Sequence, residues 1–139
     1  MASLLRRVLN EGFNQGDLGM VDELFSAESV THTDRWGMPA NRTGWKLFII
    51  ALRRCFPDLH CTLEHEIGTG DWLAAHWMLT GTHQGVFMGN APTGRPIEIA
   101  GMIFVHIEND RIIEGWMLID LMGILQQLGV IPPGIRIER

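Results

Sequence analysis

The chain has 139 residues and a mass of 15.7 kDa, a size that fits one domain built around one hydrophobic core. Hydrophobic residues make up 46% of it and charged residues 19%, which excludes an intrinsically disordered chain. The formal net charge of −5 has the wrong sign for binding nucleic acid, and the longest apolar stretch, residues 47–52, is too short to span a membrane. The start of the chain lacks the apolar core of a signal peptide, so we expect one cytoplasmic domain over residues 1–139.

Apolar residues recur at three- and four-residue steps in three segments of the first half, which predicts three helices. These segments are residues 2–13, 18–25 and 45–56. Asp17 stands where the second helix needs an N-cap, Thr43 or a neighbour caps the third, and Pro57 closes it. The segment between the second and third helices, which contains His32, Asp34 and Trp36, is predicted to be a loop.

After Pro57 the hydrophobic period changes to two, which predicts strands. In the first of them the odd-numbered residues, Ile67 included, are expected to face the core. The predicted strands are residues 59–67, 72–83, 97–107 and 111–119, and a short helix follows over 121–128. Three helices before four antiparallel strands predict an α+β domain, in which helices cover one face of a curved sheet and enclose an apolar pocket.

The hairpin between the last two strands decides which side chains share a face. Residues 107–111 suit a three-residue loop, in which Ile107 pairs with Arg111 and Phe104 faces Glu114. Even-numbered residues of both strands then lie on one side of the sheet. That set consists of Phe104, His106, Trp116, Leu118 and Asp120.

Asp120 is the residue that most suggests chemistry. It ends an apolar strand and is followed by Leu121 and Met122, so we expect its carboxylate to lose water and its pKa to rise toward neutrality. Asp is also a common N-cap, and a cap for the helix that begins at Leu121 is the alternative interpretation.

The histidines do not predict a metal site. His60, Cys61 and His65 are close in sequence, but strand alternation separates neighbours and no second close pair completes a set of four ligands. His32 either binds a substrate oxygen or is a solvated loop residue. His106 lies about 25 Å along the sheet from Asp120, too far for a direct proton relay.

Other catalytic devices are not apparent. No serine lies in a nucleophile-elbow context, Lys46 is the only lysine and is expected in solvent, and the glycines from Gly85 to Gly94 open no helix that could bind phosphate. The two cysteines lie in apolar segments and are expected to be free thiols. Several large side chains could stack on a flat polycyclic ligand or belong to the core, namely Trp36, Trp45, Trp77, Met88 and Trp116.

Four segments together resemble the SnoaL-like polyketide cyclases over nearly the whole chain. They are FNQGDLGMVDELFSAESVTH (13–32), ALRRCFPDLHCTLE (51–64), GDWLAAHWMLTGTHQGVFMGNAPTGRPIEI (70–99) and ENDRIIEGWMLIDLMGILQQLG (108–129). The most specific parts are TGTHQGVFMGNAPTGRPIEI and the W-x-x-x-D ending formed by Trp116 and Asp120. The resemblance implies the cone-shaped α+β fold of the NTF2-like (cystatin-like) proteins, with N-terminal helices on a curved, mainly antiparallel sheet.

The resemblance also implies an activity: ring closure of an aromatic polyketide ester by intramolecular aldol condensation, without metal or cofactor. Asp120 occupies the position of the family's acid/base, and the implied substrate is a hydrophobic polycyclic small molecule. Pocket positions of the family correspond to His32 and His106, with a wall at Phe13, Ile49 and Ile50; Trp36, Trp77, Phe104 and Trp116 complete the predicted substrate contacts. Many relatives have His where this chain has Gly115, and related cones often pair through the sheet, so a homodimer or homotetramer is expected.

Two alternatives remain open at the level of sequence. Another enzyme on this fold, an isomerase or an epoxide hydrolase, would need a second polar partner, and the chain has no Tyr and no Arg beside Asp120. A non-catalytic small-molecule-binding protein would keep the pocket without the chemistry.

Overall fold

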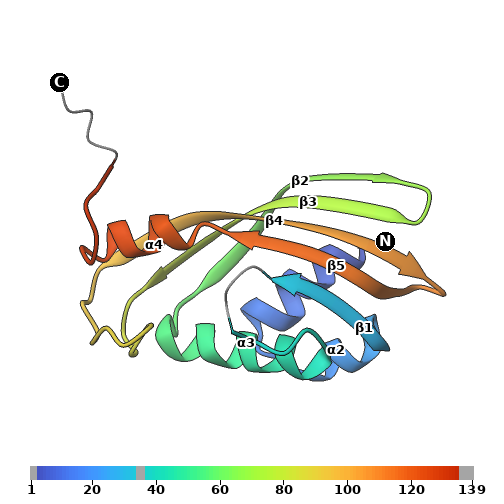
Figure 1. Cartoon of the computed structure of the whole chain (residues 1–139), viewed down its shortest axis with the longest axis horizontal. Helices are drawn as coiled ribbons and strands as arrows, with labels where there is room; N and C mark the ends of the chain where they lie inside the picture. Colours follow the sequence, from blue (N-terminus) through green and yellow to red (C-terminus); the bar gives the residue numbers. More distant parts are fainter. Residues whose placement is uncertain (1–2, 34–36, 135–139) are drawn as a thin grey trace.

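The computed structural model describes residues 3–33 and 37–134 and contains an α+β domain (Figure 1). The helices are α1 (Leu4–Arg7), the π-helical η1 (Val8–Asn14), α2 (Gly19–Leu24), α3 (Arg42–Cys55) and α4 (Leu121–Gln127). The strands are β1 (Phe25–Thr33), β2 (His60–Thr69), β3 (Trp72–Thr82), β4 (Pro96–Glu108) and β5 (Arg111–Ile119). They form one sheet in the order β1-β5-β4-β3-β2, in which only the β1–β5 pair is parallel. The predicted fold class is confirmed.

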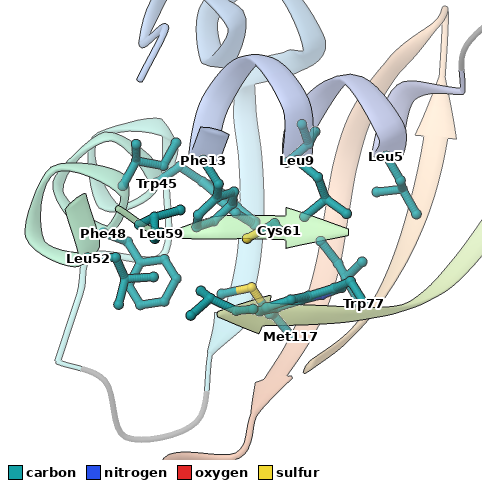
Figure 2. Close-up of a cluster of buried hydrophobic side chains, with 14 of the residues drawn as sticks. Leu5, Leu9, Phe13, Trp45, Phe48, Leu52, Leu59, Cys61, Trp77 and Met117 are labelled. Carbon is teal, nitrogen blue, oxygen red and sulfur yellow. The ribbon is translucent and has the colours of Figure 1, made fainter. Parts of the chain in front are cut away.

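The helices from α1 to α3 cover one face of the curved sheet, which we call the inner face (Figure 1). Apolar side chains from these helices meet inward-facing strand residues there and form the core. Figure 2 shows Leu5, Leu9 and Phe13 on one side of this core, with Trp77 and Met117 on the other. Among the described residues, the layer formed by α1, α2 and α3 does not extend over the opposite, outer face of the sheet, where Ile67, Met102 and Leu118 are exposed.

The first part of the predicted loop, which contains His32, is instead part of β1, whereas Asp34 and Trp36 lie outside the described residues. Two inward-facing residues of β1 are polar, Ser29 and Thr31, so the segment shows no hydrophobic alternation although both side chains are buried. The Arg42 guanidinium donates to the Phe25 carbonyl oxygen at 2.7 and 3.0 Å, which ties the start of β1 to α3. The backbone of β1 is hydrogen-bonded to β5, a parallel neighbour that lies far along the chain.

Short polar side chains accept hydrogen bonds at the starts of α2 and α3, but the N-cap residues differ from those predicted. The Asn41 side chain, and not Thr43, accepts from the Gly44 N–H at 3.2 Å and caps α3. At the start of α2 the N-cap is Leu18 and not the predicted Asp17, which lies one residue earlier and accepts from the Gly19 N–H through Oδ1 at 3.0 Å.

The β4–β5 hairpin turns in two residues, so the predicted three-residue loop is wrong. Asn109 and Asp110 have φ angles of 53° and 60°, the conformation of a type I′ turn. The resulting pairs are Glu108 with Arg111, Phe104 with Trp116, and Met102 with Leu118. Even-numbered residues still share the outer face, because a bulge next to Ile107 inserts one residue in β5.

A second bulge changes the faces of β2. Leu63 pairs with Trp77 and His65 pairs with His76, so Glu64 is an extra residue in β2. The side chains of β2 that follow Glu64 therefore face the opposite side of the sheet from the one that strict alternation predicts. Ile67, expected in the core, is therefore 75% exposed on the outer face. Glu66 turns to the helical side, where its carboxylate accepts from the Ser3 hydroxyl at 2.6 Å.

Candidate active site

Asp120 lies at the junction of β5 and α4. Its N–H still belongs to the sheet and donates to the Ala100 carbonyl oxygen at 3.1 Å, while its Oδ1 accepts from the Gly123 N–H at 2.8 Å. The capping interpretation is thus confirmed. Among the described residues Oδ2 accepts no hydrogen bond.

The expectation that Asp120 is desolvated is wrong, because the residue is exposed. Strand alternation directs it to the outer face, the face of Leu118, which is itself 65% exposed. Its apolar neighbours in sequence therefore do not cover the carboxylate. None of the described grooves and voids is lined by Asp120.

The pocket expected between helices and sheet is filled by side chains. Phe13, Ile49 and Trp77 are buried in the core, and Ile50 is half-buried beside them on α3. The Phe13 and Trp77 rings stack with centroids 6.4 Å apart (Figure 2). Two voids remain near Trp45 and Met117, each of about 10 Å³, which is room for roughly one water molecule.

Four predicted substrate contacts lie on the outer face instead and form a continuous aromatic array with Trp72. The array consists of His32, Trp116, Phe104, Trp72 and His106. Successive ring centroids lie 5.2, 5.6, 5.0 and 4.2 Å apart in that order. Because most of these rings face one another across the strands, the array presents an apolar row of ring edges to a ligand on the outer face.

An acidic residue that the sequence analysis did not single out orients one end of this array. His32 Nε2 lies 2.9 Å from a carboxylate oxygen of Glu114, and both side chains are partly exposed. His106 is the cross-strand partner of Glu114 on β5. Glu114 precedes Asp120 by six residues, so His106 and Asp120 are about 20 Å apart along the strand direction. The register thus agrees with the expectation that His106 is too distant for a direct relay.

Two open grooves border Trp116 and Leu118. The first, here called the edge groove, measures about 570 Å³ and lies beside β1, between the Thr31–Thr33 segment and Met38. The second, the face groove, measures about 370 Å³ and crosses the outer face from His65 to Leu118. Both fall within the size range of small-molecule sites. Met117 lines the edge groove and also both small interior voids.

Two further residues that the sequence analysis named are Trp36 and Gly115. Trp36 lies outside the described residues, so its predicted stacking stays a prediction. Gly115 faces inward, where a Cβ would meet Val105 Cγ1 at 3.3 Å and Thr31 Oγ1 at 3.8 Å. A side chain at this position would therefore compete with the core rather than reach the outer face.

The histidines form a contact that local spacing did not predict, whereas both cysteines are free and buried as expected. His65 and His76 face each other across β2 and β3, a contact that depends on strand pairing and could not be seen from local spacing. In the described part of the chain, no three His, Cys, Asp or Glu side chains gather as a metal site. Cys55 and Cys61 are buried free thiols, and burial raises the pKa of Cys61 to about 12.

The curved five-stranded sheet with its N-terminal helical layer defines an NTF2-like α+β protein. Residues 3–128 match the family described as SnoaL-like polyketide cyclase, and the chain belongs to that family. No curated protein matches. Within residues 3–33 and 37–134, each helix is too short or too polar to cross a bilayer.

Solved structures support the same assignment. A candidate polyketide cyclase from Streptomyces antibioticus, IdmH, is 33% identical with a TM-score of 0.78, over 91% of this chain and 96% of that one. A candidate polyketide cyclase from Bacillus cereus is 25% identical with a TM-score of 0.80, over 92% and 79%. TsrD from Streptomyces laurentii, at 23% identity and a TM-score of 0.82 over 92% and 93%, shares the fold.

Proposed function

We propose that the protein closes a ring of an aromatic polyketide ester by intramolecular aldol condensation, with Asp120 as the acid/base. Membership of the polyketide cyclase family supports the substrate class. The observation that carries the proposal is the state of the Asp120 carboxylate, in which Oδ1 is used in the cap and Oδ2 accepts no hydrogen bond from any described residue. One oxygen can hold the residue in place while the other exchanges a proton.

The chemistry needs only one such group. Asp120 removes a proton from the carbon between a ketone and an ester, which both carbonyls acidify. The enolate carbon attacks a second ketone and forms the new carbon–carbon bond. The carboxylic acid then returns its proton to the alkoxide, so the base is regenerated and no atom is lost. Proton transfer of this kind typically contributes about 10²–10⁴-fold in rate.

The edge groove is the substrate site that we propose. Leu118, which lines it, precedes Asp120 by two residues on the same face, about 7 Å along the strand. Trp116 is about 13 Å from Asp120 by the same measure, a span comparable with a tricyclic aromatic system. A substrate lying in the edge groove against Trp116 and His32 would thus direct its reacting side chain toward Asp120.

The test is Asp120→Asn, assayed with an aromatic polyketide methyl ester that carries a cyclisable ketone side chain. Asn still accepts a hydrogen bond at an N-cap but cannot act as the base. We expect kcat to fall about 10²–10⁴-fold while binding of the ester, followed by Trp fluorescence, is retained. Asp110→Asn is the matched control, because it makes the same change at an exposed aspartate of the β4–β5 turn that lines neither groove.

The second candidate function is ligand binding without catalysis. The observation in its favour is that Asp120 is exposed and caps α4, a structural role that needs no reaction. Unchanged turnover of the ester by Asp120→Asn would remove Asp120 from the mechanism. Binding of the ester without turnover by the unaltered protein would establish the non-catalytic function.

We also propose that the protein assembles as a homodimer or homotetramer. Exposed apolar side chains on β4 and β5, among them Phe104, Trp116 and Leu118, support pairing on this part of the outer face. A second copy of the chain bound there would shield the edge groove from solvent. Light scattering should give a mass of at least two chains, and Leu118→Glu should reduce it to one; a single-chain mass for the unaltered protein at 100 μM would contradict the proposal.

A further inference from the structure

Two histidines on the outer face lie side by side on neighbouring strands. His65 on β2 pairs with His76 on β3, and their Nδ1 atoms are 3.1 Å apart. The rings are stacked with centroids 5.3 Å apart, and both side chains line the face groove. The cyclisation proposed above uses neither of them.

The separation of the two nitrogen atoms is close to that required by a shared metal ion. Imidazole nitrogens bind a metal such as zinc at about 2.0–2.1 Å, so two of them on one tetrahedral ion lie about 3.3–3.4 Å apart. The His65–His76 pair comes within a few tenths of an ångström of this value. The contact is a hydrogen bond in which one Nδ1 carries the proton, so metal binding requires the tautomer with that proton on Nε2. Small rotations of the exposed His65 ring and the half-buried His76 ring would then turn both Nδ1 lone pairs toward one point in the groove.

A third donor lies on the next strand. Met102 on β4 is the cross-strand partner of His76, its side chain is 61% exposed, and it lines the same groove. Directly paired residues have Cβ atoms about 4.5–5.5 Å apart, within reach of a flexible thioether. Neither lysine nor arginine occurs among the described residues that line the groove, so no fixed cation there opposes a metal ion.

We propose that His65, His76 and Met102 form a binding site for Cu(I). The donor set decides the choice of metal, because thioether sulfur is a soft ligand that selects Cu(I) and imidazole also suits copper. Among the described residues no carboxylate or thiolate joins the two histidines. The site therefore lacks the further ligands with which structural zinc sites reach four-coordination.

The experiment measures transfer of Cu(I) from the coloured bicinchoninate complex to the full chain, without oxygen at pH 7. The protein is expected to withdraw one Cu(I) per chain. His65→Gln and His76→Gln should each lower the affinity at least 100-fold, and Met102→Leu, which keeps the side-chain volume, at least 10-fold. His60→Gln changes another exposed histidine of β2 and should have no effect. Thermal unfolding followed by circular dichroism establishes that each variant is folded.

Two results would overturn the site: no withdrawal of Cu(I) by the unaltered protein, or an affinity that His65→Gln and His76→Gln leave unchanged. Equal Cu(I) affinity of Met102→Leu and the unaltered protein would remove the thioether and with it the preference for Cu(I). Because the readout is metal binding, it is independent of turnover, and failure of the cyclase proposal would not alter it.

Discussion

Asp120 has two oxygen atoms in different situations, and this allows its structural and chemical roles to be separated. Oδ1 satisfies the Gly123 N–H, one of the donors that the first turn of α4 leaves without an intrahelical partner. Oδ2 makes no such bond among the described residues. A substitution that keeps an acceptor but removes the ionisable group therefore changes chemistry alone, whereas one that removes the acceptor changes stability as well.

Stability measurements on Asp120 variants should show this difference. We expect Asp120→Ala to lower the free energy of unfolding by about 1 kcal/mol, because the cap is lost, and Asp120→Asn by a few tenths at most. Urea denaturation followed by Trp fluorescence measures both. Equal destabilisation by Asn and Ala would mean that the charge, and not the hydrogen bond to Gly123, supports α4.

The buried thiol of Cys61 should make stability depend on pH in the alkaline range. Burial raises the pKa of Cys61 to about 12, whereas an unfolded cysteine titrates near 8.5. The folded state then binds more protons than the unfolded state between these values, so stability is complete below about pH 8.5 and is lost as pH rises. The slope should approach ~1.4 kcal/mol per pH unit.

Urea denaturation at pH 8 and pH 10 tests this dependence. Cys61→Ala is the control and should lose less stability between the two pH values, although burial also raises the pKa of Cys55 and leaves part of the effect. The same pH dependence in both proteins would rule out Cys61 as its source.

At the scale of elements, one buried hydrogen bond joins α3 to β1. Trp45 Nε1 donates to Thr31 Oγ1 at 2.7 Å, and both residues are buried. The hydroxyl is polar in an otherwise apolar layer, so its partner decides whether its burial is tolerated. This bond helps to explain how a strand with polar inward-facing residues can lie against the core.

Breaking this bond from either side should be costly. Trp45→Phe leaves the Thr31 hydroxyl without its partner and Thr31→Val does the same to the indole N–H, so each should destabilise by about 1–3 kcal/mol. The double variant should lose less than the sum of the two, with a coupling of about 1 kcal/mol in a double-mutant cycle. Additive losses would show that the bond contributes nothing beyond the packing of each side chain.

The elements differ in how well the sequence predicts them, and the reason is physical. The first and third helices can be predicted from the sequence because their apolar residues repeat along the helix face that packs on the sheet. β1 cannot, since Ser29 and Thr31 face inward and its ladder comes from β5, more than eighty residues later. Local periodicity carries no information about such pairing.

The candidate site was predictable to a similar extent. Even-numbered residues of β4 and β5 share one face, as expected, but the register differs by two residues and pairs Phe104 with Trp116 where Glu114 was expected. The sequence could not show whether Phe104 and Trp116 lie on the inner or the outer face. Alternation shows which residues share a side of the sheet, but it does not show which side the helices cover. The His65–His76 contact depends on a bulge at Glu64, and no glycine or other turn-forming residue at that position predicts the bulge.

At the scale of the whole molecule, the sheet separates the predicted substrate contacts into two groups. Phe13, Ile49 and Trp77 lie on the inner face within the core, while His32, Trp116 and the rest of the aromatic array lie on the outer face. No single ligand in the present structure could touch both. A substrate that used both groups would have to pass the edge of β1, where Met117 borders the groove and the interior voids alike.

Truncation of Met117 should open that passage. Met117 is 3% exposed, and Met117→Ala should cost about 2–5 kcal/mol, since the removed side chain leaves a cavity continuous with the two voids. A small apolar ligand should enter the cavity and restore part of the stability by mass action. We expect saturating benzene to raise the Tm of Met117→Ala by several degrees and to leave the unaltered protein unchanged.

Met117→Leu is the matched control, because it conserves volume and should gain no benzene-dependent stability. A Tm of Met117→Ala that benzene does not change would mean that the core collapses into the space, which would leave the interior residues Phe13, Ile49, Ile50 and Trp77 as packing alone. A benzene-dependent rise would instead support their proposed role as a substrate wall, reached through the edge groove when the flexible side chain of Met117 moves aside.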